Sequence, residues 1–155
     1  MTTALQRAKD ALDHSDAAKG ILAGIVGGLA GSFLMSRVQQ RGPKVAKSSG
    51  DESSGDEFNS AARDALTAPF VHYAFGAAMG AMYGYYVETT GHRGLKTGAR
   101  FGMSVWAAAD EAASPALGLA AVERPAEVHA ESFASHVVFG VTTEVVRRGV
   151  RAVLR

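Results

Sequence analysis

The feature that most constrains this chain is a stretch of sixteen uncharged residues, GILAGIVGGLAGSFLM at 20–35, bounded by Lys19 and Arg37. Its glycines recur every three or four residues, at Gly20, Gly24, Gly27 and Gly31. Such spacing keeps them on one face of a helix, where another backbone can approach closely. A soluble core helix would usually carry larger apolar residues there, because a glycine costs a helix in water ~1 kcal/mol. The stretch therefore predicts a membrane helix that stays in the protein and is not cleaved off as a signal peptide.

Three further apolar blocks follow, and we expect membrane-spanning helices near 20–36, 66–87, 94–110 and 131–147. Glycines recur in the later blocks as well. The glycines expected at helix interfaces are Gly20, Gly24, Gly27, Gly31, Gly76, Gly80, Gly84, Gly94, Gly98, Gly102 and Gly140. The predicted fold is all-α, a four-helix transmembrane bundle with glycine-rich helix interfaces. A soluble helical bundle is the alternative, because the blocks are short and the third contains Lys96 and Arg100.

The polar segments suggest how the chain is divided. Residues 1–19 are expected to form a weakly amphipathic lead, and 20–37 the first transmembrane helix. Residues 38–64 are rich in glycine, serine and charge, which is typical of a disordered linker. Residues 65–155 would then hold three further membrane helices.

A short pattern, His-x-x-Phe-Gly, occurs twice, as HYAFG at 72–76 and HVVFG at 136–140. Each copy follows a helix with a glycine row, so blocks one and two form one unit and blocks three and four another. We infer two duplicated helical hairpins in parallel orientation. Chance is the alternative, since only three positions of the pattern are fixed.

Composition excludes several classes of function. The chain has no cysteine, which rules out disulfides, thiolate metal sites and cysteine nucleophiles. Sixteen Lys and Arg nearly balance fifteen Asp and Glu, so no overall field attracts nucleic acid. With four spans, ten of the sixteen basic residues fall on the side of the two termini, which predicts cytoplasmic termini.

Residues 66–148 resemble the YagU-like family of bacterial inner-membrane proteins. The segments that carry the resemblance are VWAAADEAASPALGL at 105–119 and ESFASHVVFG at 131–140. The matching positions are Trp106, Asp110, Glu111, Pro115, Gly118, Leu119, Glu131, His136, Phe139 and Gly140. The resemblance implies a multi-pass protein of the bacterial inner membrane and no particular activity.

The ionisable residues in or beside the apolar blocks are the candidate site. They are His72, Asp110, Glu111, Glu131, His136 and Glu144. Charged groups at bilayer depth normally face a partner or a water-filled cavity. We expect His72 and His136 to lie close together, near Glu144 or the acidic pair 110–111, and favour the acidic pair as the partner of His136.

Three interpretations of this polar cluster stay open. The histidines either fix helix packing through hydrogen bonds, form a proton or cation pathway, or bind a divalent metal with the carboxylates. No catalytic motif stands in the chain, so we expect no enzyme and no cofactor, with a divalent metal as the alternative. The expected partners are the lipid bilayer and a second copy or another membrane protein.

Overall fold

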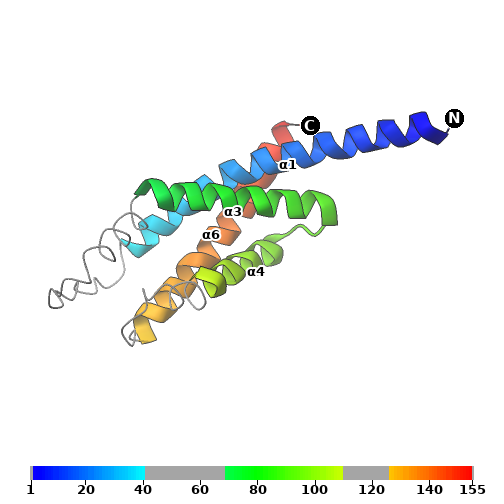
Figure 1. Ribbon diagram of the computed structural model, residues 1–155. Coiled ribbons are helices and arrows are strands. Elements are labelled where there is room, and N and C mark those ends of the chain that lie inside the picture. The colour runs from blue at the N-terminus through cyan, green and yellow to red at the C-terminus, as the bar shows by residue number, and fades with distance from the viewer. Residues whose placement is uncertain (1, 41–68, 110–125, 155) are drawn as a thin grey trace, which may run out of the picture.

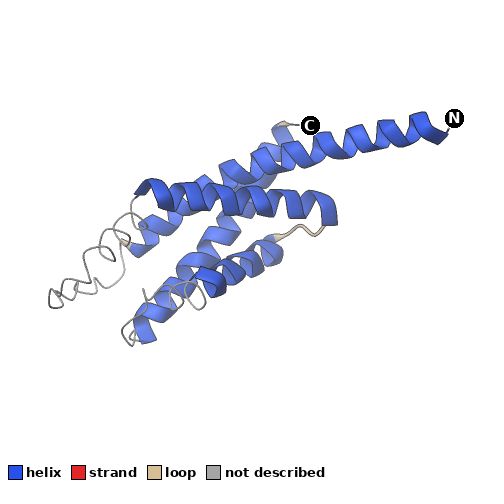
Figure 2. Cartoon of the chain, in the orientation of Figure 1, coloured by secondary structure: helices blue, strands red, loops and turns tan. Residues whose placement is uncertain are grey.

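The computed structural model describes residues 2–40, 69–109 and 126–154. These residues form four α-helices and no strand: α1 (Thr2–Gln39), α3 (Pro69–Thr90), α4 (Leu95–Trp106) and α6 (Ala126–Val153) (Figures 1 and 2). The all-α prediction is therefore confirmed.

The helix bounds follow the apolar blocks, with differences at the ends. The expected lead and the first apolar block form one uninterrupted helix, α1, which extends well beyond the other helices at its N-terminal end (Figure 1). Helix α3 begins at Pro69, a residue that suits a first helical turn because the N–H it lacks has no partner there. Helix α4 continues into a π-helical turn at 107–109. The expected linker lies outside the described residues from position 41 onward.

Among the described helices, the segment Ser15–Gln39 of α1 is the one that is long and apolar enough to cross a membrane. This finding concerns length and composition alone.

The helices pack in the spatial order α3, α1, α6, α4. Helix α1 packs against both α3 and α6, and α6 also packs against α4. Helices α3 and α4 are neighbours in the chain, but they diverge from the loop at 91–94 and are not packed along their lengths (Figure 1). The arrangement is thus an open row whose centre is the pair α1 and α6.

Helices α1 and α3 meet backbone to backbone through glycines. A Cβ atom added to Gly24 would overlap the carbonyl oxygen of Gly80, and one added to Gly28 would overlap that of Gly76. Position 20 likewise faces position 84. The residue numbers run in opposite directions along the contact, so the two helices are antiparallel.

A second stripe of α1 glycines faces α6. A Cβ atom on Gly27 would lie 2.5 Å from the carbonyl oxygen of Thr143, and one on Gly31 would lie 2.8 Å from that of Phe139. The expectation of one row through Gly20, Gly24, Gly27 and Gly31 is therefore wrong. Two adjacent stripes, one of which includes Gly28, let α1 pack closely on two neighbours.

The same kind of contact joins α4 to α6. A Cβ atom on Gly98 would lie 2.7 Å from the carbonyl oxygen of Gly140, and one on Gly102 would overlap that of His136. Gly94 does not share this role. It precedes α4 with a φ of 148° and, like Gly91 with a φ of 71°, adopts a backbone conformation that favours glycine. Gly94 therefore shapes the loop and is not an interface glycine.

Aromatic rings fill the space that the backbone contacts leave. Tyr83 of α3 is buried, and its ring stacks on Phe101 of α4 with centroids 4.5 Å apart. Phe101 in turn lies 6.0 Å from Phe139 of α6. Through Phe101, these ring contacts connect α4 to both α3 and α6.

Candidate functional site

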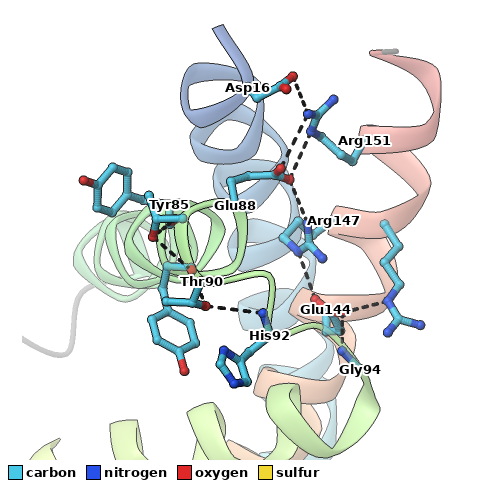
Figure 3. A network of polar contacts seen from close by, with 12 residues as sticks. Asp16, Tyr85, Glu88, Thr90, His92, Gly94, Glu144, Arg147 and Arg151 are labelled. Atoms are coloured by element: carbon cyan, nitrogen blue, oxygen red, sulfur yellow. Dashed lines mark hydrogen bonds and ion pairs between the residues drawn. The ribbon is translucent and has the colours of Figure 1, made fainter. Parts of the chain in front are cut away.

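A partly buried network of charges lies at the end of the molecule where α3 ends and α4 begins (Figure 3). Its centre is Glu144 of α6, whose side chain is fully buried. The Nε atom of Arg147 donates to Oε2 of Glu144 at 2.9 Å, and the Nε atom of Arg148 donates to Oε1 at 2.7 Å. Both arginines lie one helical turn after Glu144, which is the spacing at which side chains of one helix meet.

Two other helices extend this network. Glu88, near the end of α3, accepts from Nη1 of Arg147 at 3.3 Å and from Nε of Arg151 at 3.0 Å. Arg151 also donates from Nη2 to Oδ1 of Asp16 on α1 at 2.7 Å. These ion pairs therefore link α1, α3 and α6.

The network forms an alternating series of cations and carboxylates. Following the contacts, the order is Arg148, Glu144, Arg147, Glu88, Arg151, Asp16 and Lys19, with 3.9 Å between Lys19 and Asp16. Burial alone would lower the pKa of Arg151, but the neighbouring Glu88 and Asp16 outweigh it and raise that pKa above its usual value. Arg151 therefore stays charged. The two ends of the series, Arg148 and Lys19, are also cations.

Glu144 also fixes the loop between α3 and α4. The backbone N–H of Gly94 donates to Oε1 of Glu144 at 2.9 Å. Gly94 caps the start of α4, where N–H groups lack partners within the helix and a negative charge is stabilising. One carboxylate thus holds two arginines of its own helix and the first turn of another.

The two histidines of the repeated pattern lie at the other end of the molecule and line one cavity of about 320 Å³. All four helices contribute to its wall. The lining residues are Ser32, Met35, Gln39, His72, Phe75, Gly76, Val105, Ala109, Ser132, His136 and Phe139. The sequence-based expectation that His72 and His136 share a site agrees with this placement.

Backbone carbonyls hold both imidazoles. The Nδ1 atom of His136 lies 2.9 Å from the carbonyl oxygen of Ser132, one turn earlier on α6. The Nε2 atom of His72 lies 3.4 Å from the carbonyl oxygen of Ser32, so this contact ties α3 to α1. When Nδ1 of His136 donates, its Nε2 atom is an acceptor.

The two copies of the repeated pattern are not packed alike. Phe139 is 3 % exposed and lies in the core, whereas Phe75 is 47 % exposed. His136 is buried and His72 is half-buried. The two rings therefore sit at one cavity in different environments.

The remaining candidate residues are placed elsewhere. Glu144 belongs to the arginine network and is not among the residues that line the histidine cavity. Glu131 is half-buried and is likewise absent from that lining. Asp110 and Glu111 lie outside the described residues, as does their expected pairing with His136. Within the described ranges, no three His, Cys, Asp or Glu side chains are grouped closely enough to hold a metal ion.

The residues that sequence reasoning missed are the partners of Glu144. From the sequence, Arg147 and Arg148 count only among the basic residues that set the topology, although their spacing from Glu144 indicates ion pairs on one helix face. Glu88 and Asp16 carry no comparable signal. Their pairing depends on how three helices are aligned, which local sequence does not encode.

Comparison of the chain with family models, curated proteins and solved structures finds no match.

Proposed function

We propose that this protein is a multi-pass membrane protein whose helices pack through glycines around a polar interior. The observation that carries the proposal is that as many polar as apolar residues are buried among the described residues, while many large apolar side chains are exposed. The buried polar residues are Ser32, Ser135, His136, Thr143, Glu144 and Arg147. The exposed large apolar residues include Leu22, Val26, Leu29, Phe33, Leu34, Phe70, Phe75, Met82 and Val145.

This distribution suits a bilayer better than water. Soluble proteins rarely expose large continuous apolar surfaces, whereas large apolar side chains are exposed along both α1 and α3 here. In hydrocarbon, apolar side chains face outward without cost, while charged groups pair with one another in the interior. Close contact through small residues is also the usual way in which membrane helices associate.

Helix lengths are compatible with several crossings. At 1.5 Å per residue, the 22 residues of α3 span about 33 Å and the 28 residues of α6 about 42 Å, against a hydrocarbon core of about 30 Å. Helix α4 is shorter and carries exposed Lys96 and Arg100, whose long stems would have to extend to the headgroups.

The orientation follows from the charges. Five basic side chains gather at the end of the molecule that also holds the C-terminal turn of α6. By the positive-inside rule, we propose that this end, and with it both termini, faces the cytoplasm. The YagU-like resemblance of residues 66–148 supports a location in the bacterial inner membrane.

We infer a structural or accessory role rather than an enzymatic one. The described carboxylates of the network are engaged with arginines, and both cavity histidines contact backbone carbonyls.

The proposed duplication is supported by the way in which the helices pair. Helix α1 pairs with α3 in the same orientation as α4 pairs with α6. In each pair, the first helix starts at the charged end and contacts its partner through glycines.

Single cysteines test the membrane proposal directly, because the native chain has none. The contacts of Gly24 with Gly80 and of Gly28 with Gly76 place Val26 and Ala78 at one level, near the middle of the apolar segment Ser15–Gln39 and of α3. Both side chains are exposed. In open membrane fragments, V26C and A78C are expected to react with a water-soluble maleimide far more slowly than T90C, since thiolates do not form in hydrocarbon.

Each outcome of the labelling has a distinct meaning. Equal labelling of all three variants would contradict membrane insertion and support the soluble bundle. Protection of V26C with free labelling of A78C would support a single span through α1. Labelling in SDS, where all three thiols are accessible, supplies the maximum for each variant.

A cation site in the histidine cavity is the second candidate function. The specific observation that favours it is that His72 and His136 line the same cavity. Neutral imidazole is a common ligand for zinc and related metals, and it also binds and releases protons near neutral pH. A metal at this position would need further ligands from water or from outside the described residues.

Zinc binding tests this candidate. If the cavity binds the ion, Zn²⁺ is expected to raise the thermal midpoint of the purified protein, because a ligand of the native state stabilises it. The rise should be lost in His72→Gln and in His136→Gln. His92→Gln is the matched control, since His92 is exposed and does not line this cavity. A rise that persists in both cavity variants would exclude the site.

A further inference from the structure

The charged end of the molecule contains a second cavity, of about 560 Å³. It is lined by Asp16, Lys19, Glu88, Arg93, Arg147, Arg148, Arg151 and Ala152. Five of these side chains are cationic and two are carboxylates. Glu144 lies beside the cavity and adds a third carboxylate through its contacts with Arg147 and Arg148.

The charges of this site do not cancel. Each of the three carboxylates is already shared between two cations of the alternating series. Arg93, which is exposed, adds a fifth cation. Five cations against three carboxylates leave a surplus of two positive charges around one cavity.

The surplus lies at the accessible part of the cavity. Arg147 is 2 % exposed and its carboxylate partners hold it in place. Arg148 and Lys19, at the two ends of the series, are 47 % and 37 % exposed. A guanidinium has five N–H donors, and Arg148 uses its Nε donor on Glu144. The exposed cations therefore retain donors for a further anion. The buried ion pairs beneath them hold the surrounding side chains in place.

We propose that this cavity binds the phosphate of an anionic lipid headgroup. The inference rests on the proposed membrane location, which puts this end of the helices at the cytoplasmic headgroup layer. Arginine matches phosphate well because its planar donors can bind two oxygens at once. Basic pockets between membrane helices on the cytoplasmic side are typical headgroup sites. A headgroup phosphate would offset one of the two surplus charges and bridge α1, α6 and the loop that carries Arg93.

The test uses the purified full-length chain in a zwitterionic detergent. The probes are mixed micelles that contain phosphatidylglycerol or, for comparison, phosphatidylcholine, and the readout is the thermal midpoint. Phosphatidylglycerol is expected to raise the midpoint and phosphatidylcholine to leave it unchanged, since binding to the native state alone stabilises it. An equal rise with both lipids, or none with phosphatidylglycerol, would overturn the proposal.

Charge-neutralising variants locate the effect. The double variant Lys19→Gln and Arg93→Gln removes two cavity cations and is expected to lose most of the rise. The double variant Lys96→Gln and Arg100→Gln removes two exposed cations that do not line this cavity, and it should keep the rise. Equal loss in both would indicate general charge attraction and contradict a site. If the first variant is unstable without lipid, Arg93→Gln alone takes its place.

Inorganic phosphate separates the two sources of the anion. A rise with inorganic phosphate as large as that with phosphatidylglycerol at equal concentration would replace the lipid by a free phosphate and overturn the proposal. The cysteine labelling decides the membrane location independently. Protected cysteines without a lipid-specific rise would leave the proposed function standing and refute this inference alone, whereas free labelling of all three cysteines would refute the proposed function itself.

Discussion

Replacing Glu144 by glutamine is expected to lower the free energy of unfolding by about 3–5 kcal/mol, the usual cost of removing one partner from a buried ion pair. The amide keeps the shape of the side chain but leaves Arg147 buried with Glu88 as its remaining carboxylate. It also weakens the acceptor for the N–H of Gly94 and for Arg148. Unfolding of the purified protein in detergent by added SDS measures the change.

Glu127→Gln is the matched control for this variant. Glu127 lies in the first turn of the same helix and is exposed. Its neutralisation removes a favourable interaction with the helix dipole, which is worth less than about 1 kcal/mol. Equal stability of the two variants would show that the network around Glu144 contributes little to the fold.

Replacing Gly80 by alanine is expected to destabilise the protein by about 1–3 kcal/mol, the typical cost of overfilling a packed interior. A Cβ atom at this position would overlap the carbonyl oxygen of Gly24 and lie 2.8 Å from the Cα atom of Gly28. Both obstacles are backbone, so relief requires the two helices to move apart. The same SDS unfolding measurement reports the loss.

Gly149→Ala should change stability in the opposite direction. Gly149 lies in α6, and a Cβ atom there would meet nothing within 4 Å. Alanine is favoured over glycine in a helix by up to about 1 kcal/mol, so this variant should be as stable as the native chain or more so. Destabilisation by both substitutions would mean that loss of glycine, rather than close backbone contact, causes the effect.

The all-α class could be predicted from the sequence because apolar blocks report local structure. The identity of the glycine neighbours could not. Positions 27 and 28 are adjacent in the chain but about 100° apart around the helix axis, so they face different partners. Sequence spacing alone assigned Gly27 to the single expected row and left Gly28 out, although each glycine touches its own neighbouring helix.

The candidate site was predicted in part, and the reason lies in the kind of contact. The repeated pattern drew attention to His72 and His136, which line a common cavity. The expectation that Glu144 lies near the histidines assumed that a buried carboxylate pairs with a polar group on another helix. Arginines on its own helix, three and four residues away, reach it instead.

The central position of α1 has a consequence for how the chain assembles as it is made. Helices α1 and α3 are complete long before α6 emerges, so they can pair early through their glycines. The face of α1 with Gly27 and Gly31 then stays uncovered, and Asp16 and Glu88 lack Arg151, until the last helix arrives. A chain that stops before α6 would therefore leave Glu88 without Arg147 and Arg151, beside a bare stripe of α1 backbone, while Asp16 would keep only Lys19 of its own helix.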